Sequence, residues 1–378
     1  MILAWDLMEE SCHAGIKMSS ITDIRDLRTI HSELASLQEL RKKGVSGLKD
    51  IFSENARLII SPSNQCYNNC LHCVADSNPK GEIMKFSDFE KIDSKFFELF
   101  KFADFGRRGN PIIYSSEGRD LADMISFIYG RGIKNFSIAA AIMKEDLPIA
   151  DKLGKIASQN EINIETMITY HHYFQNLDRA GLAKDFNTSI KSFMRFSSSL
   201  LISLLGDGYL NGGEAMAEDV ARTFAENREI IFQDITISSE EKRIMNYGSR
   251  TAELQIPPAD ARVYPLGRFR EYLSQKKILN QYEKMFEKSL SDYVCPDLIR
   301  WPGIIIEPDG DLNLCASFEA IASKEAIVSN IFRKPFNEVE HDLMRFHEKE
   351  IKWFAENIDE IIECRTSTCK MKNCCYSK

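Results

Sequence analysis

The stretch RLIISP at residues 57–62, followed by CYNNCLHC at residues 66–73, sets three cysteines directly after a strand-like apolar run. Their spacing is C-x3-C-x2-C. Three thiolates this close together can bind three irons of a [4Fe–4S] cluster and leave the fourth iron without a protein ligand. A small molecule can bind an open iron of this kind and receive electrons there. The stretch therefore predicts a strand that ends in a metal-binding loop.

The composition argues against several classes of protein. The chain has 378 residues, of which 44% are apolar and 28% are charged, as in ordinary globular proteins. Its net charge of −8 argues against nonspecific binding to nucleic acid. There is no apolar run of about 18 residues that would predict a transmembrane helix, and residues 1–10 lack the basic start of a signal peptide. We therefore expect a cytoplasmic protein with no membrane and no nucleic-acid partner.

Strand-like and helix-like segments alternate from residue 57 onwards. The predicted strands are 57–62, 111–115, 135–141, 162–170, 200–205 and 229–237, and the predicted helices are 86–105, 121–129, 147–158, 182–196 and 215–226. This order predicts an α/β fold with a parallel sheet, curved into a partial (β/α)6 TIM-type barrel. Active sites of parallel barrels lie at the carboxyl ends of the strands, where the cysteine loop begins.

The rest of the chain divides into further predicted units. We expect an N-terminal helical extension over 1–52, the barrel over 53–240, a linker or helical bridge over 241–290, and a cysteine-rich domain over 291–378. Within the last unit, strands at 303–306 and 312–314 are joined by a turn at 308–310, and a helix follows over 336–362. Ten cysteines in a chain without an export signal indicate metal binding rather than disulfides.

The first cysteine motif resembles the cluster loop of the radical S-adenosylmethionine (radical SAM) enzymes, C-x3-C-x-Φ-C, with His72 at the usually aromatic position. The resemblance implies that Cys66, Cys70 and Cys73 hold a [4Fe–4S] cluster whose fourth iron binds SAM. It also implies that one electron, from a reductant such as flavodoxin or ferredoxin, cleaves SAM to methionine and a 5′-deoxyadenosyl radical. That radical takes a hydrogen atom from the substrate. The alternative is a zinc knuckle, which needs four ligands.

A second cysteine group resembles the auxiliary-cluster extension, called SPASM or twitch, found after many radical SAM barrels. Cys295 and Cys315 follow the pattern C-x14-G-x4-C, flanked by PLGR at 265–268 and SNI at 329–331. The tail departs from the family pattern, with cysteines at Cys364, Cys369, Cys374 and Cys375. We expect one auxiliary [4Fe–4S] cluster, held by Cys295, Cys315 and two of the tail cysteines. A second, incompletely ligated cluster and a zinc ribbon are the alternatives.

Three other segments are candidates for cofactor or substrate contacts. Ser115, Ser116 and Glu117 stand where the family has a Gly-Gly-Glu-Pro motif that contacts the SAM amino group; the alternative is a loop carboxylate near a helix start. Thr169, Tyr170, His171 and His172 follow the fourth predicted strand and would bind SAM or substrate, or are ordinary loop residues. Tyr170, His171 and His172 are the catalytic candidates. The glycine-rich segment 206–214 is either a ligand contact or a turn that needs positive φ.

The sequence thus predicts a radical SAM oxidoreductase. By resemblance, enzymes with both cysteine groups often crosslink or oxidise residues of ribosomal peptides or proteins, with the auxiliary cluster carrying an electron or anchoring the substrate. The first alternative is a dehydrogenase or rearrangement enzyme for a small metabolite, which gains weight because residues 1–52 show no winged-helix, peptide-binding segment. The alternative of a different class is a non-catalytic iron–sulfur or zinc-binding protein.

Overall fold

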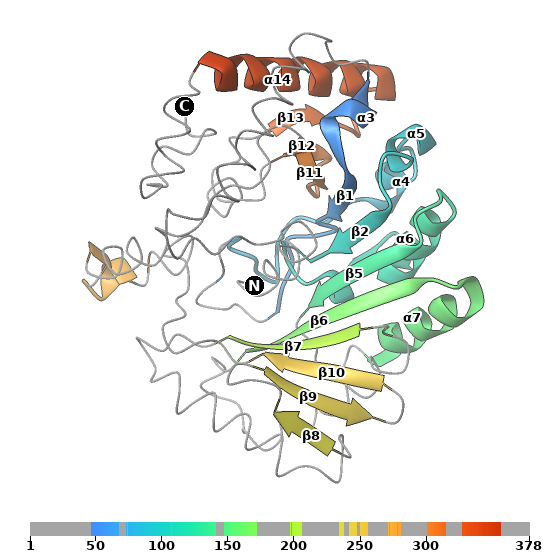
Figure 1. Cartoon of the computed structure of the whole chain (residues 1–378), viewed down its shortest axis with the longest axis vertical. Helices are drawn as coiled ribbons and strands as arrows, with labels where there is room; N and C mark the ends of the chain where they lie inside the picture. Colours follow the sequence, from blue (N-terminus) through green and yellow to red (C-terminus); the bar gives the residue numbers. More distant parts are fainter. Residues whose placement is uncertain are drawn as a thin grey trace, which may run out of the picture.

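The framework of the molecule is one sheet (Figure 1). The computed structural model describes residues 47–67, 73, 75–106, 108–140, 147–171, 197, 199–205, 234–237, 242–247, 250–255, 271, 273–277, 279–280, 301–314 and 327–356. In these residues the strand order is β13-β12-β11-β1-β2-β5-β6-β7-β10-β9-β8. The bounds are β1 (Phe52–Ile60), β2 (Phe102–Phe105), β5 (Asn135–Ala140), β6 (Asn163–His171), β7 (Ser199–Leu205), β8 (Asp234–Ile237), β9 (Lys242–Tyr247), β10 (Arg250–Gln255), β11 (Trp301–Ile306), β12 (Asp311–Asn313) and β13 (Ile327–Asn330).

Seven neighbouring strands, from β11 to β10, run parallel. The outer pairs, β12 with β13 and β9 with β8, are antiparallel to their neighbours. The prediction of an α/β fold with a parallel sheet is therefore confirmed. β13 and β8 are the edge strands of the sheet in the described part of the chain.

Helices cover one face of the sheet (Figure 1). They are α4 (Phe86–Phe89), α5 (Ser94–Phe97), α6 (Leu121–Tyr129) and α7 (Leu147–Asn160). Alternate strand residues point to opposite faces, and the row Leu58, Ala103, Phe136 and Ile164 belongs to the apolar core with these helices. The next row, Ile59, Asp104, Ser137 and Glu165, faces the other way and is largely polar. The sheet thus has a helix-covered apolar face and an opposite polar face.

The second strand of the sheet was predicted in the wrong place. Residues 86–105, predicted as one helix, form α4, α5 and then β2. The helix is interrupted where the side chain of Asp93 accepts a hydrogen bond from the Lys95 amide and caps α5. Residues 111–115, predicted as the second strand, contain the 3-10 helix η1 (Pro111–Ile113). Pro111 has no amide hydrogen to give to a sheet.

The sixth parallel strand also differs from the prediction. Residues 234–237 of the predicted strand 229–237 form β8, which is an outer antiparallel strand. The strand that runs parallel to β7 is β10, in the segment predicted as a linker or helical bridge. β9 and β10 pair from Tyr247 and Arg250, so the strands are joined across two residues, Gly248 and Ser249. Such a pair between alternating runs is a hairpin signal that the sequence reading overlooked.

The remaining predictions fall into two groups. The predicted helices 121–129 and 147–158 and strands 57–62, 135–141, 162–170, 200–205, 303–306 and 312–314 are confirmed within two residues at most boundaries, although β1 starts at Phe52. The last predicted helix, 336–362, is confirmed as α14 (Phe336–Glu356) within the described residues, and 357–362 lie outside them. α14 packs on α3 (Leu48–Ile51) and β13. The predicted helices 182–196 and 215–226 and most of the extension 1–52 lie outside the described residues.

Two further features bear on the predicted domains. β11 belongs to the predicted C-terminal unit, yet it pairs in parallel with β1, with Ile304 opposite Leu58. The described strands of that unit therefore extend the main sheet. Among the described helices, none is both long and apolar enough to cross a membrane.

Candidate functional site

The cysteine loop begins where β1 leaves the sheet. β1 lies between β11 and β2, and just beyond its end the Ser61 amide donates a hydrogen bond to the Ile306 carbonyl at 2.9 Å. The chain then runs outward through Cys66 and returns beside itself. The amides of Met84, Asn64 and Cys66 donate to the carbonyls of Pro62, Glu82 and Asn78 at 2.9, 2.7 and 3.0 Å. These bonds close the base of the loop.

Close backbone packing at this base requires a glycine. A Cβ atom on Gly81 would lie 2.1 Å from the carbonyl oxygen of Asn64, well inside van der Waals contact. Only a residue without a side chain lets the returning strand approach the outgoing one this closely. The loop that carries the cysteines is therefore anchored at both ends by rigid backbone.

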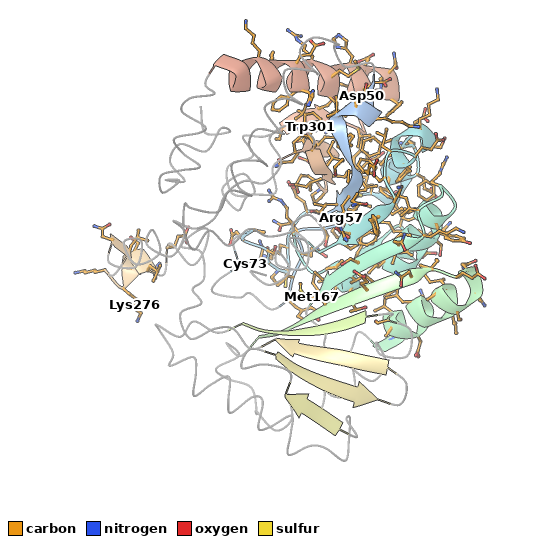
Figure 2. All side chains as sticks on the ribbon, viewed as in Figure 1. Asp50, Arg57, Cys73, Met167, Lys276 and Trp301 are labelled. Atoms are coloured by element: carbon orange, nitrogen blue, oxygen red, sulfur yellow. The ribbon has the colours of Figure 1, made fainter. Side chains whose placement is uncertain are left out.

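Cys66 and Cys73 lie in this loop, half-buried, and neither is in a disulfide. Figure 2 shows Cys73 on the side of the sheet to which the arrowheads of the parallel strands point. The Ser77 amide donates a hydrogen bond to Cys73 Sγ at 3.2 Å. An amide donor of this kind can orient a cysteine sulfur as a metal ligand. Cys70 and His72 lie outside the described residues.

The side chain of Ser77 ties the loop to its neighbours. Its hydroxyl donates to Asn64 Oδ1 at 2.7 Å and accepts a hydrogen bond from the Gly109 amide at 2.9 Å. Ser77 is 2% exposed. One buried residue thus connects the outgoing chain, Cys73 and the segment that follows β2.

The segment after β2, in its described residues 106 and 108–111, packs against the cysteine loop. The Asn110 amide donates to the Gln65 carbonyl at 2.7 Å. Gly109 has φ +65°, and a Cβ there would lie 2.3 Å from the Ser63 carbonyl oxygen. Sequence reasoning missed this segment, although Gly109-Asn110-Pro111 is a recognisable turn signal.

A buried ion pair joins the two segments that follow the neighbours of β1 in the sheet. Arg108 follows β2, Glu307 follows β11, and 2.7 Å separates Arg108 Nε from Glu307 Oε2. The two residues are 8% and 5% exposed. Because β2 and β11 are the two neighbours of β1, this pair links the loops on either side of the cysteine loop.

A second buried pair lies on the polar face of the sheet. Arg57 Nη1 on β1 donates to Asp104 Oδ1 on β2 at 2.7 Å, and the guanidinium lies over the Phe102 ring. Burial raises the pKa of Asp104 to about 6, although the attraction of Arg57 opposes the rise. Asp104 is thus ionised at neutral pH and gains a proton in mild acid.

Ser115, Ser116 and Glu117 form part of a hairpin, not the end of a strand in the main sheet. β3 (Ser115–Ser116) pairs with β4 (Arg119–Asp120), and Glu117 and Gly118 have φ of +54° and +75°. The Glu117 carboxylate accepts hydrogen bonds from the Ser87 amide at 2.7 Å and the Ser87 hydroxyl at 2.9 Å. These bonds lower the pKa of Glu117. The described contacts give Glu117 a capping role at the start of α4, and they do not test the predicted contact with SAM.

Thr169, Tyr170 and His171 end β6, in register with Ser203, Leu204 and Leu205 of β7. Since carboxyl ends of parallel strands share one edge of a sheet, their backbone lies at the same edge as the cysteine loop. Their side chains and His172 lie outside the description, as does the glycine-rich segment 206–214.

The predicted auxiliary-cluster cysteines, Cys295, Cys315, Cys364, Cys369, Cys374 and Cys375, lie outside the described residues. The hairpin of β11 and β12, which lies between Cys295 and Cys315 in the chain, is described. Gly310 has φ +84° in its turn, and the Asn330 side chain donates to the Asp309 carbonyl at 3.0 Å and to Asp311 Oδ1 at 2.8 Å. Asn330, part of the SNI segment, thus holds the hairpin. In the part of the chain that the structure describes, no three histidine, cysteine or acidic residues group together as a metal site.

No protein-family model matches the chain, and a search of curated proteins found no match.

Proposed function

We propose that this chain is a radical SAM enzyme and that Cys66, Cys70 and Cys73 hold its [4Fe–4S] cluster. The observation that carries the proposal is the placement of Cys66 and Cys73. Both are half-buried thiols outside any disulfide, in a loop that leaves β1 at the carboxyl edge of a parallel sheet. Their chemistry fits iron, which thiolates bind well, and the amide of Ser77 already points at one sulfur.

The surroundings support a site at which a cofactor is held rigidly. Gly81, Ser77 and Gly109 fix the base of the cysteine loop, and the buried pair of Arg108 and Glu307 braces the strands on both sides. Reactive sites need this kind of support, because a ligand displaced by about 1 Å loses much of its function. When bound, the cluster and SAM would supply a 5′-deoxyadenosyl radical that takes a hydrogen atom from the substrate.

The segment after β2 is our preferred neighbour for SAM. The Gly-Gly-Glu-Pro motif of the family follows the second strand, and in this chain RGNP at 108–111 follows β2. Asn110 and Gly109 contact the backbone of the cysteine loop directly. Thr169, Tyr170 and His171 would border the same edge from β6. The six strands β1, β2, β5, β6, β7 and β10, which neighbour one another in chain order, support a partial barrel around this edge.

For the overall reaction we propose modification of a residue in a peptide or protein, by crosslinking or oxidation. The second cysteine group supports this proposal by its resemblance to an auxiliary-cluster domain, which would hold one further [4Fe–4S] cluster. A flavodoxin or ferredoxin would supply the electron. Oxidation or rearrangement of a small metabolite is the competing substrate class. Transfer of deuterium from a labelled candidate peptide into 5′-deoxyadenosine separates the two.

The first experiment is a metal count and a cleavage assay on the full chain, purified without oxygen. We expect iron and sulfide in multiples of about four per chain, and 5′-deoxyadenosine when SAM and dithionite are added. Separate replacement of Cys66, Cys70 and Cys73 by Ala should each remove about four irons and abolish the product. Cys12→Ala, outside both cysteine groups, is the control and should keep both. Stoichiometric zinc without iron, or iron-loaded protein that makes no 5′-deoxyadenosine, would overturn the proposal.

A further inference from the structure

Ser77 makes three hydrogen bonds that converge on the cysteine loop. Its amide donates to Cys73 Sγ at 3.2 Å, its hydroxyl donates to Asn64 Oδ1 at 2.7 Å, and the hydroxyl accepts from the Gly109 amide at 2.9 Å. The hydroxyl has one hydrogen to donate, and that hydrogen has a partner. The residue is 2% exposed, so water offers no easy replacement for these bonds.

The two side-chain bonds fix the direction of the amide. The backbone amide of Asn64 donates a hydrogen bond to the Glu82 carbonyl. Gly109 approaches the Ser63 carbonyl so closely that a Cβ atom there would lie 2.3 Å from its oxygen. Both anchors are therefore held by backbone that does not depend on Ser77. With its hydroxyl pinned between them, Ser77 has little freedom to turn its N–H away from the sulfur.

An amide hydrogen bond to a cysteine sulfur has two known effects on an iron–sulfur cluster. It orients the ligand, and it draws negative charge from the sulfur, which raises the reduction potential of the cluster. Ser77 lies four residues after Cys73 in the chain, within the same closed loop. The same bond would therefore affect both how tightly the cluster is bound and its reduction potential.

We propose that Ser77 is a positioning residue that orients Cys73 as an iron ligand and raises the reduction potential of the site. The inference rests on the proposed function, because it requires that Cys73 binds iron. The hydroxyl acts through the amide: the contacts with Asn64 and Gly109 hold the N–H on the sulfur. Ser77 and Asn64 are then one unit, and removing either side chain loosens the same bond.

The test uses the iron-loaded full chain with Ser77→Ala, Asn64→Ala and the double variant. Iron release to a chelator should be about fivefold faster in Ser77→Ala, the factor that loss of the amide–sulfur hydrogen bond alone corresponds to. The double variant should release iron no faster than the faster single variant, since the two residues share one network. The midpoint potential should become more negative, which general loss of stability does not cause. Ser126→Ala removes a helical hydroxyl bonded to Ala122, far along the chain, and should change neither quantity.

The outcomes separate the two proposals. If wild-type protein holds iron and cleaves SAM, but Ser77→Ala shows the wild-type release rate and potential, Ser77 has no positioning role and the inference alone fails. If wild-type protein holds no iron, the proposed function fails first and the role of Ser77 falls with it. Additive release rates in the double variant would also overturn the inference, because they would show that Asn64 and Ser77 act independently.

Discussion

Arg108 and Glu307 form a buried ion pair, with 2.7 Å between Nε and Oε2, that joins the loop after β2 to the loop after β11. β1 lies between these strands and leads into the cysteine loop. A buried pair contributes little net stability, but removing one partner leaves a charge in an apolar environment. The pair therefore adds a buried contact between the loops on either side of the cysteine loop.

Glu307→Gln tests this dependence while keeping the size of the side chain. We expect it to lower the free energy of unfolding by about 3–5 kcal/mol, because Arg108 would stay buried after losing the negative charge of Glu307. The double replacement Arg108→Met with Glu307→Leu should recover most of the loss. Urea unfolding followed by circular dichroism measures both. A Glu307→Gln variant as stable as the wild type would show that Arg108 does not depend on Glu307.

Alanine replacement of Gly109, with Gly118 as the matched control, tests how closely the loop after β2 packs. Both have positive φ, +65° and +75°, so alanine strains the backbone similarly at each, by about 1–2 kcal/mol. A Cβ at Gly109 would also lie 2.3 Å from the Ser63 carbonyl and 2.7 Å from the Gln65 carbonyl, whereas nothing lies within 4 Å at Gly118. We expect Gly109→Ala to lower the melting temperature further than Gly118→Ala and to lower iron content as well. Equal iron content in the two variants would contradict this.

The sequence signals succeeded where local chemistry decides the structure. Asp120 caps α6 through a capping box, and α6 begins and ends as its apolar spacing predicts. They failed at β2, because Phe96, Phe97 and Phe100 set a helical spacing and no glycine or proline separates them from Phe102 and Phe105. A strand of four residues leaves too short a pattern to override that spacing.

The site shows the same division. The cysteine motif predicted a loop at a strand end, and Cys66 and Cys73 lie in one. The contacts of that loop with Gly109, and the pair of Arg108 with Glu307, join segments far apart in the chain. No local pattern encodes such contacts, since they depend on which strands become neighbours of β1.

The raised pKa of Asp104 predicts how the stability of the protein depends on pH. Burial raises its pKa from 3.8 to about 6, so the folded protein binds this proton more tightly than the unfolded chain. Its contribution to stability is therefore largest below about pH 4 and is lost as the pH rises through about 6. Asp104→Asn removes this titration. The difference in unfolding free energy between wild type and variant should change by up to about 3 kcal/mol between acid and neutral pH. A difference that stays constant with pH would contradict the raised pKa.

Replacement of Glu117 tests whether this residue has a structural role or binds the cofactor. Both carboxylate oxygens accept hydrogen bonds from Ser87, which lower the pKa of Glu117. The stability from these bonds is present above the ordinary pKa of a glutamate and is lost as the pH falls through the lowered value. With its carboxylate occupied in this way, we expect Glu117→Ala to leave iron content and SAM affinity unchanged and to destabilise α4 slightly.

Ser87→Ala is the matched control for Glu117→Ala, because it removes the hydroxyl partner of the same carboxylate. If Glu117 acts only through Ser87, both variants should lower the melting temperature in the same direction, and the double variant should add little to Glu117→Ala alone. Equilibrium dialysis of SAM against the iron-loaded variants measures the other quantity. Weaker SAM binding in Glu117→Ala alone, with Ser87→Ala unaffected, would mean that the carboxylate leaves Ser87 to contact the cofactor. The hairpin of β3 and β4 would then border the site together with the loop after β2.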